Sequence, residues 1–379
     1  MQSNLLFPQK KRFPKLENDV KADVVIVGGG MVGVSSAYHL QQAGYEVIVI
    51  EQDEVGSCAS GASSAILYYG SGTNFLDAID LFGKEKAEVL WKESSQTMKV
   101  VEELVVKNKL ELEVGFRKPG GIMVSQTEKE NEYLEKEREN LNGIGIRTEM
   151  LSGDDIMNYY TGKKFLKGLY FPECFQIHSA HFCASLAEHF DIKLFEQTPY
   201  TKHEQTNNEL LVTTPAAKIS CNKILLATNL YPLLGFDKYF DRETSIITAS
   251  TALSDDQLKK TWPRETFIWT MEDDYQLFYP HDGRNIMELY KIDGQKEAIR
   301  KFYPGGFEIG RVWGFAWAKA KDWLPMIGKI GDNIFAAVAM GDQGITMSNT
   351  TGRKITYLLD GKDDDFLSLC SINRFNENS

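Results

Sequence analysis

The segment from Ala22 to Glu51 restricts the fold of this chain more than any other stretch of its sequence. It begins with a β-branched run, Asp23 to Val27, which predicts a strand buried on both faces. Gly28-Gly29-Gly30-Met31-Val32-Gly33 follows, and glycine at its first, third and sixth positions allows a tight turn, close approach to a pyrophosphate and close packing of helix on strand. Val34 to Gln42 then predicts a helix, and a second strand ends in Glu51.

This order of strand, glycine turn, helix, strand and acid predicts a dinucleotide-binding site. N–H groups at the start of the helix, from Met31 to Val34, favour phosphate groups, because a helix N-terminus carries partial positive charge. The Glu51 carboxylate suits ribose hydroxyls and disfavours a 2′-phosphate, so NADP is not expected. The alternative is a tight strand–helix turn that binds no ligand.

Length and composition narrow the class of protein. A chain of 379 residues predicts two domains, and 42% hydrophobic with 25% charged residues is typical of a globular protein. A net charge of −11 disfavours nucleic acid and anionic membranes as partners. No apolar run is long enough to span a membrane, and the N-terminus lacks the order of a signal peptide, so we expect a cytoplasmic protein.

Neither cysteine nor histidine indicates a metal site. The five cysteines are scattered and odd in number, which predicts reduced thiols rather than disulfides. His178 and His181, with Cys183 nearby, lack a carboxylate partner or a cysteine pair at metal spacing. We therefore expect structural histidines and no bound metal.

The elements after Glu51 follow from periodicity and turn residues. Residues 1–21 predict an extended arm, 75–110 two helices interrupted near Gly83, 111–125 a strand pair, and 128–141 a charged helix. Further along, 209–221 predicts a hairpin, and the alternating segments 244–254, 267–279 and 285–290 predict a large antiparallel sheet.

Two loops of small residues are candidates for contacts with the dinucleotide. The loop from Gln52 to Ala65 contains Ser60, Gly61, Ala62 and Ser63, whose small side chains let backbone press against an extended ligand; a flexible surface loop is the alternative. The second, Gly341-Asp342-Gln343-Gly344, lies between a predicted strand (334–340) and helix (345–359). It predicts a second helix N-terminus directed at the same ligand, with N–H groups from Ile345 and Thr346.

With these residues in place, the chain resembles the D-amino-acid-oxidase-like FAD-dependent oxidoreductases, the group that includes glycine oxidase, sarcosine oxidase and γ-glutamylputrescine oxidase. Arg12 to Leu16, leading into Asp23 to Gly30, resembles the start of the putrescine-oxidase-like branch. Gly56 to Ser63 resembles the family's loop under the flavin, Asp322 to Gly328 its D-x-L-P-x-I-G turn, and Gly341 to Gly352 its C-terminal flavin helix.

The resemblance implies FAD rather than NAD, bound non-covalently because no cysteine is clearly placed for attachment. Glu51 would hold the ribose, Tyr200 would meet the adenine through its backbone, and Ala227 and Thr228 would close the nucleotide end. The fold implied is α/β and α+β, with a Rossmann-like FAD-binding domain assembled from discontinuous segments and a mostly antiparallel-sheet substrate domain. We expect 1–75, 145–235 and 320–379 in the FAD-binding domain, and 76–144 and 236–319 in the substrate domain.

The resemblance also implies oxidation of a C–N bond in a small amine or amino acid, by hydride transfer to flavin N5, with oxygen or another acceptor reoxidising the flavin. The alternatives are a flavin dehydrogenase of a hydroxy acid or polyol phosphate, and a catalytically silent FAD-holding partner protein. The candidate catalytic residues are Tyr279, His281, Glu288 and Trp313, with Tyr68 and Arg311 as further residues on the substrate side.

Two departures from the family bear on the chemistry. Asp342-Gln343 stands where many relatives carry His-Gly, and an acid there would oppose negative charge on a reduced flavin. His281 stands where glycine-oxidase-like chains place a carboxylate-binding arginine, which weakens the expectation of an α-amino-acid substrate.

Overall fold

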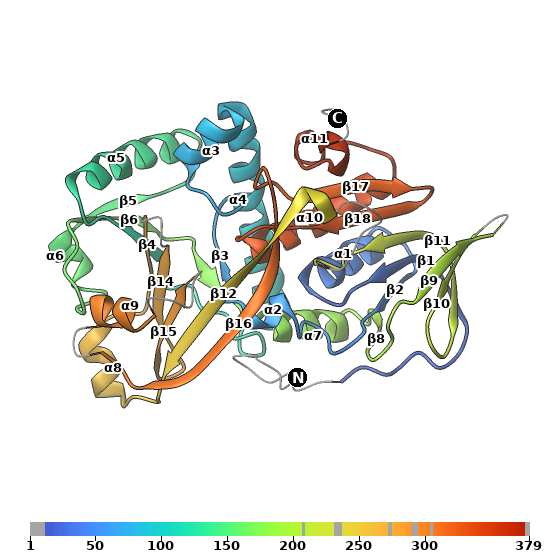
Figure 1. Cartoon of the computed structure of the whole chain (residues 1–379), viewed down its shortest axis with the longest axis horizontal. Helices are drawn as coiled ribbons and strands as arrows, with labels where there is room; N and C mark the ends of the chain where they lie inside the picture. The colour runs from blue at the N-terminus through green and yellow to red at the C-terminus, as the bar shows by residue number, and fades with distance from the viewer. Residues whose placement is uncertain are drawn as a thin grey trace.

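The computed structural model describes residues 12–206, 209–230, 237–271, 275–289, 295–303 and 306–375. Within these ranges the chain forms two parts, each built on an eight-stranded sheet (Figure 1). Residues 1–11 of the predicted arm, and Tyr290 at the end of the predicted strand 285–290, lie outside the described residues. No helix in the described ranges is long and apolar enough to cross a membrane.

The first sheet contains the predicted dinucleotide motif at its centre. Its strands, in spatial order, are β17 (Met326–Gly331), β18 (Ile334–Val338), β11 (Lys218–Leu226), β1 (Val20–Val27), β2 (Val47–Ile50) and β8 (Lys193–Phe195), and β10 (Leu210–Thr213) and β9 (Lys202–Gln205) extend it beside β11. β1 pairs in parallel with β11 and β2, and β10 pairs antiparallel with β11, which confirms the predicted hairpin. Residues Val24 to Ile26 of β1 are fully buried, as a strand covered on both faces requires.

Helices pack against this sheet and against one another. They are α1 (Met31–Gln42), α7 (Ser179–His189), α10 (Gly344–Leu359) and α11 (Asp365–Leu369), followed by the short η2 (Ile372–Phe375). α10 packs against α1 although the two lie at opposite ends of the sequence. A Cβ on Gly352 would lie 2.2 Å from the Ser35 hydroxyl oxygen, so this close crossing needs glycine.

The second sheet is antiparallel except at one strand pair. Its strands, in spatial order, are β16 (Ile309–Ala320), β12 (Phe240–Ser250), β15 (Arg284–Leu289), β14 (Gln276–His281), β13 (Phe267–Thr270), β4 (Gly121–Val124), β6 (Lys167–Phe171) and β5 (Glu149–Ser152). Only β13 and β4 are parallel in this sheet of the described chain. The predicted antiparallel sheet in the middle of the chain is therefore confirmed.

Helices of the second part surround this sheet, and short elements complete the fold. The helices are α3 (Phe75–Phe82), α4 (Lys84–Lys107), α5 (Glu128–Gly143), α6 (Gly153–Ile156), α8 (Asp255–Thr261) and α9 (Gln295–Phe302). α3 and α4 confirm the two helices predicted on either side of Gly83. The short elements are α2 (Ala59–Ala62), β3 (Ile66–Leu67), β7 (Phe175–Gln176) and η1 (Asp237–Tyr239).

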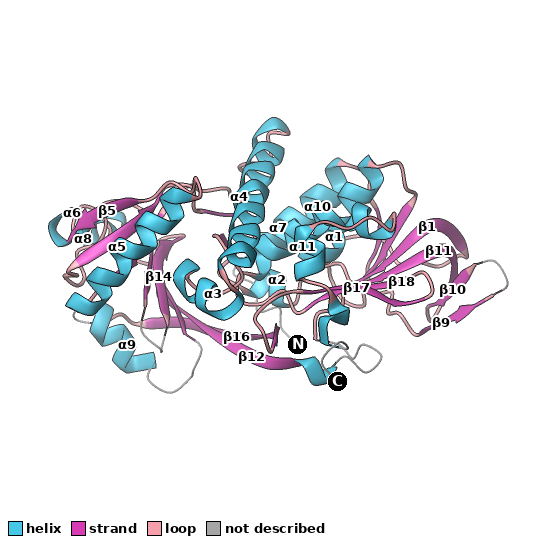
Figure 2. Cartoon of the chain, turned by 90° about the horizontal axis from the view of Figure 1, so that it is seen from above, coloured by secondary structure: helices cyan, strands magenta, loops and turns pink. Residues whose placement is uncertain are grey.

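The long ribbon of β12 and β16 joins the two parts. Its register runs from Phe240 opposite Ala320 to Ser250 opposite Ile309, and it crosses the middle of the molecule in Figure 1. Figure 2 shows the ribbon extending from the second sheet toward the first, with α4 standing between the two parts.

Two sequence predictions need correction. The strand pair predicted over 111–125 is wrong, because 111–115 form turns and only β4 is a strand, whose neighbours β13 and β6 come from elsewhere in the chain. The predicted segment 145–235 of the FAD-binding domain begins too early, because β5 and β6 belong to the second sheet.

Candidate active site

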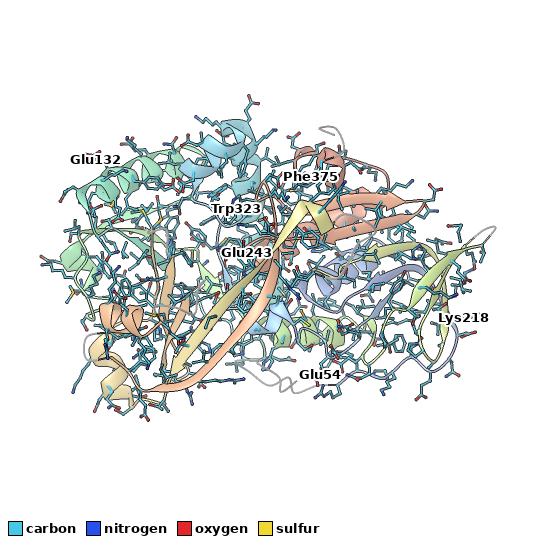
Figure 3. The ribbon with its side chains drawn as sticks, viewed as in Figure 1. Glu54, Glu132, Lys218, Glu243, Trp323 and Phe375 are labelled. Atoms are coloured by element: carbon cyan, nitrogen blue, oxygen red, sulfur yellow. The ribbon has the colours of Figure 1, made fainter. Side chains whose placement is uncertain are left out.

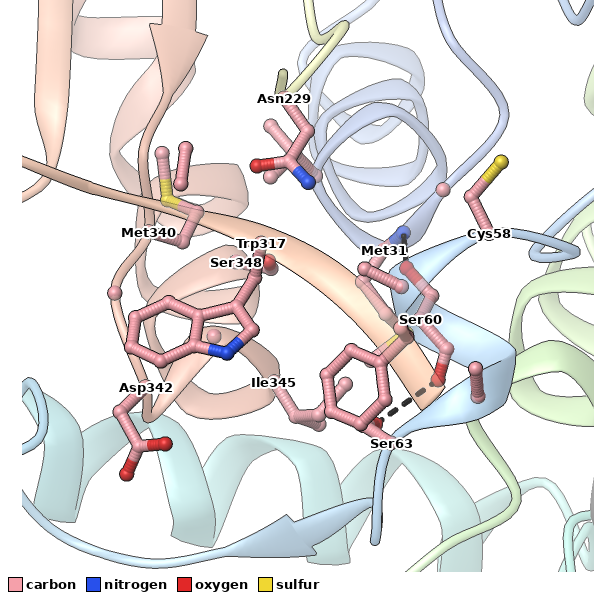
Figure 4. Close-up of a pocket in the computed structure, with 18 of the residues that line it drawn as sticks. Met31, Cys58, Ser60, Ser63, Asn229, Trp317, Met340, Asp342, Ile345 and Ser348 are labelled. Atoms are coloured by element: carbon pink, nitrogen blue, oxygen red, sulfur yellow. Dashed lines mark hydrogen bonds between the residues drawn. The ribbon is translucent and has the colours of Figure 1, made fainter. Parts of the chain in front are cut away.

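A cavity of about 1210 Å³ is lined by residues from both parts of the molecule. It extends from the glycine turn after β1, past the ribbon of β12 and β16, to the inner face of the second sheet; Figure 4 shows part of its lining. We call the region around Gly28, Glu51, Tyr200 and Ala227 the nucleotide end.

The three spaced glycines of the turn have different roles. Gly28 has a φ of +114°, and a Cβ there would lie 2.6 Å from the carbonyl oxygen of Ala227. A Cβ on Gly33 would lie only 1.9 Å from the carbonyl oxygen of Gly28, so Gly33 serves the contact of helix on strand and does not line the cavity. Gly30 does line it, with only Ser60 close to its virtual Cβ.

Backbone groups hold the Glu51 carboxylate at the nucleotide end. Its Oε2 accepts a hydrogen bond from the Gly29 N–H at 2.7 Å, and its Oε1 accepts one from the Asp53 N–H at 2.9 Å. Burial raises the pKa of this carboxyl, while both N–H donors oppose that rise. The acid is therefore fixed in orientation beside the glycine turn, and Gln52 lines the cavity next to it.

The small-residue loop forms one wall of the cavity rather than a free surface loop. The Met31 N–H donates to the Ser60 hydroxyl oxygen at 3.1 Å, and the Ser63 hydroxyl donates to the Ser60 carbonyl at 3.1 Å (Figure 4). The Trp313 indole N–H donates to the Ala62 carbonyl at 2.8 Å, which ties the loop to β16. Ser60, Ala62 and Ser63 line the cavity, whereas the predicted contact Gly61 does not.

The C-terminal glycine loop lies on the opposite wall. Gly341, Gln343, Gly344 and Ile345 line the cavity as predicted residues, and Asp342 joins them. Thr346 is fully buried instead, and its hydroxyl oxygen accepts a hydrogen bond from the Tyr68 N–H at 3.2 Å. The start of α10 is thereby fixed to the segment that carries Tyr68.

Aromatic side chains enclose the end of the cavity that meets the second sheet. We call this region the chamber; its lining includes Tyr68, Phe267, Trp269, Tyr275, Leu277 and Glu288. The rings of Tyr68 and Trp269 meet edge to face with centroids 4.8 Å apart. Such walls exclude water and attract cations through the negative faces of their rings.

Glu288 is the one carboxylate that β15 contributes to the lining. The side chain is 6% exposed, and its Oε2 has no hydrogen-bond partner among the described residues. Burial raises its pKa to about 8, the negative charge of Asp342 adds to this rise, and the hydroxyls of Ser64 and Ser245 oppose it.

The other predicted catalytic residues do not line the cavity. Tyr279 is fully buried beside Phe267, with ring centroids 5.5 Å apart. His281 lies further along β14, 5.6 Å from the ring of His178, and burial together with Arg117 lowers its pKa to about 2. Trp313 supports the loop at Ala62, and Arg311 lies over its ring at 5.4 Å.

Several residues that line the cavity are not among the predicted site residues. Those on the ribbon or near it include Asn229, Arg242, Phe315, Trp317 and Trp323. Lys319 forms an ion pair with Glu243 at 3.0 Å and lies 4.2 Å from the ring centroid of Trp323, which places a fixed charge pair where the two parts meet (Figure 3). The alternation of residue types along 309–320 is enough to predict a strand there. Only the pairing of this strand with β12 places it against the cavity.

Acidic groups dominate the charged residues of the described lining. The acids are Glu51, Asp53, Glu54, Asp77, Glu288 and Asp342, and the one Lys or Arg among the described lining residues is Arg242. Cys58, labelled in Figure 4, lines the nucleotide end, and the other four cysteines are buried. No group of three or more potential ligands among the described residues could hold a metal ion.

The cavity fits FAD in shape and in chemistry. Its length joins a glycine turn to an aromatic chamber, so one elongated ligand can contact both. The hydroxyl oxygen of Thr228 lines the nucleotide end as a buried atom with no partner in the described chain, which is suited to a polar ligand. Two helix N-termini, those of α1 and α10, meet the cavity and supply positive partial charge.

Comparison with known proteins places the chain in a family. A family model described as FAD dependent oxidoreductase matches residues 23–358, so the chain belongs to that family and is a flavoenzyme that uses FAD.

Known proteins resemble this chain at low sequence identity. The chain is 23% identical to the gamma-glutamylputrescine oxidoreductase of Escherichia coli and 23% identical to the probable oxidoreductase OrdL of Haemophilus influenzae; each match covers 95% of this chain and 88% of the relative. Glycine oxidase from Geobacillus kaustophilus superposes with a TM-score of 0.74 at 18% identity, covering 93% of this chain and 99% of that one. The structural match confirms the Rossmann-like and antiparallel-sheet fold.

Proposed function

We propose that this enzyme oxidises a C–N bond of a small amine or amino acid. The observation that carries the proposal is the chamber, where aromatic rings and the carboxylate of Glu288 surround the end of a cavity that fits FAD. The names of the relatives support it, since gamma-glutamylputrescine oxidoreductase and glycine oxidase are named for compounds that contain C–N bonds. When bound, FAD supplies the hydride acceptor, and the oxidised product is an imine that water hydrolyses.

The residues of the chain position both ligands. We propose that the nucleotide end holds FAD non-covalently through Glu51, the glycine turn and the loop at Ser60, while the start of α10 supplies positive partial charge. Tyr68 and Trp269 exclude water and pack against the alkyl part of the substrate, and a cationic amine gains from their ring faces. We further propose that, among the described residues, 12–75, about 172–230 and 320–375 form the FAD-binding domain and the others the substrate domain.

Two measurements test the function. The first is the visible absorption spectrum of the purified protein before and after denaturation and removal of the precipitate. Yellow FAD in the supernatant supports non-covalent binding, yellow pellets indicate covalent attachment, and a colourless protein that takes up no added FAD contradicts the cofactor.

The second measurement is anaerobic reduction of the bound flavin by panels of amines, amino acids and hydroxy acids. Bleaching by amines or amino acids supports the proposal, and admitting air then shows whether oxygen is the acceptor. Bleaching only by hydroxy acids or polyol phosphates indicates the dehydrogenase alternative. Bleaching by none of them indicates an FAD-holding protein without this activity.

A further inference from the structure

We infer that Glu288 recognises the substrate's ammonium group and takes its proton, so that the enzyme acts on amines with no carboxylate next to the reacting carbon. The inference rests on the proposed function and adds to it a residue and a narrower substrate class. The observations that support it are the position of Glu288 in the second sheet and the groups that surround its side chain.

One row of paired residues crosses the whole second sheet on its inner face. Directly paired residues share a face of a sheet, and the row runs through every strand. In order it is Trp313, Ile247, Glu288, Leu277, Trp269, Met123, Leu169 and Met150. Seven of these eight residues are apolar, so Glu288 is a single carboxylate within a hydrophobic row.

No cationic partner among the described residues balances this carboxylate, and only the hydroxyls of Ser64 and Ser245 act in favour of its charge. The described chain contains no salt bridge to Glu288, and its Oε2 is buried without a hydrogen-bond partner. A buried charge is costly unless it is paired with an opposite charge and hydrogen-bonded, and Glu288 lacks the opposite charge. Because Glu288 borders the cavity, a cation bound in the chamber would supply the missing partner.

The groups that face Glu288 favour a cation. Asp342 approaches from the loop before α10, and Tyr275 and Tyr279 approach from β14 and the residue before it. Ser64 and Ser245 contribute hydroxyls, and the neighbouring Ile247 and Leu277 are apolar. None of these groups carries positive charge, so two acids act together on the amine.

The same arrangement disfavours a carboxylate next to the amine. An α-amino acid would place its carboxylate in the chamber beside Glu288 and Asp342, where like charges repel. Arg242 is five residues before Ile247 on β12, about 16 Å along the strand, so it cannot reach a carboxylate held next to Glu288.

The proton transfer balances without a further reactant. The N–H bond of the ammonium breaks, its electron pair stays on nitrogen, and the proton forms an O–H bond with Oε2 of Glu288. The products are a neutral amine, which can lose hydride, and a neutral carboxylic acid. Burial supports this step, because it raises the pKa of Glu288 to about 8 and thereby brings it closer to that of an alkyl ammonium.

The test compares FAD-loaded wild type with Glu288→Gln, which keeps the shape of the side chain. Glu149→Gln is the control, because Glu149 is an exposed carboxylate on β5 of the same sheet, outside the cavity. One readout is anaerobic flavin reduction by n-butylamine and by both enantiomers of alanine, from pH 6 to 10.5. The other is the shift in the flavin absorption spectrum caused by tetramethylammonium, a cation that the enzyme cannot oxidise.

We expect butylamine to reduce the wild-type flavin at least 100-fold more efficiently than alanine, with a bell-shaped pH profile limited by Glu288 near 8 and by the amine near 10. In Glu288→Gln, efficiency at pH 8 falls at least 100-fold and rises with pH up to the pKa of the amine. Tetramethylammonium binds Glu288→Gln at least tenfold more weakly, and the control matches wild type.

Other outcomes separate the inference from the function. Equal reduction by alanine and butylamine overturns the substrate class. Butylamine activity and a pH profile that Glu288→Gln leaves unchanged overturn the role of Glu288, while the proposed function stands. If no compound reduces wild type, the proposed function fails, and tetramethylammonium still decides whether Glu288 recognises a cation: binding that the variant loses supports this, and equal binding overturns it.

Discussion

The nucleotide end and the chamber use opposite means to form one cavity. The nucleotide end is made largely of backbone: Gly28 and Gly33 permit close approach, and even the Glu51 carboxylate is held by two N–H groups. The chamber is made of side chains that strands from distant parts of the sequence bring together. A site made of backbone tolerates few residue types at its key positions, whereas the side chains that line a chamber can be replaced without disturbing the strands that carry them. The two ends should therefore respond differently to substitution.

The largest effect should come from Gly33→Ala at the nucleotide end. The new Cβ would lie 1.9 Å from the carbonyl oxygen of Gly28, and backbone in a buried strand–helix turn cannot move aside as a flexible side chain can. We expect the free energy of unfolding to fall by more than the roughly 3 kcal/mol that ordinary overpacking costs, and we expect bound FAD to be lost. Urea denaturation and flavin content measure both. Gly143→Ala is the control, because its Cβ would meet nothing within 4 Å; equal stability of the two variants would contradict the close packing.

In the chamber, Glu288→Gln should instead stabilise the protein without ligand at high pH. The folded pKa of about 8 lies above that of an unfolded glutamate, so the folded state holds the proton more tightly. The Glu288 charge therefore does not lower the free energy of unfolding below about pH 4. It lowers it progressively as the pH rises to 8, and above that value the destabilisation is constant. We expect the variant to unfold like wild type at pH 4 and to be more stable by on the order of 3 kcal/mol at pH 9. A wild type that is the more stable of the two at pH 9 would show that Glu288 has a structural partner.

Glu51→Gln should weaken FAD binding at the nucleotide end. The amide retains one acceptor for two N–H donors, and it loses the charge that the ribose hydroxyls would contact. We expect at least tenfold weaker binding, about 1.4 kcal/mol, by titration of the apoprotein with FAD. Glu54→Gln is the matched control, since Glu54 also lines the cavity but pairs with the exposed Arg12. Equal losses in the two variants would show that only the net charge of this end matters.

Trp313→Phe should have the smallest effect. It removes the hydrogen bond to the Ala62 carbonyl and leaves the ring packing largely in place. We expect a loss of about 1 kcal/mol in stability, and FAD and amine affinities within about twofold of wild type. Thermal unfolding and anaerobic titration measure these quantities. A 100-fold loss of flavin reduction with FAD still bound would restore Trp313 as a catalytic residue.

Most of the predicted residues at the nucleotide end line the cavity, because the determinants of this end are local. The glycines, Glu51 and the loop at Ser60 lie within one short stretch, and their residue types follow from steric and electrostatic needs that any backbone site of this kind imposes. Thr346 shows the limit of such reasoning, because it follows the glycine loop as predicted but is fully buried and does not line the cavity.

The chamber was predicted only in part because strand pairing cannot be deduced from periodicity. Glu288 lines the cavity, but Tyr279 and His281, which continue the alternation of Leu277 along β14, do not. Trp269 and Trp317 are not among the predicted site residues, since their approach to the cavity depends on the register of β13 and β16 with other strands. The false strand pair at 111–125 has the same origin: β4 finds its partners outside its own neighbourhood.

The packing of α10 on α1 has a consequence for the way the protein is made. The N-terminal glycine turn emerges from the ribosome long before Gly341 to Gly352, yet it needs that last segment to close the cavity and cover α1. Domains usually fold as units while synthesis proceeds, but here the first unit waits for the last. Nascent chains that end before residue 341 should therefore be unable to retain FAD and should depend on chaperones, whereas full-length chains released from the ribosome take up the cofactor.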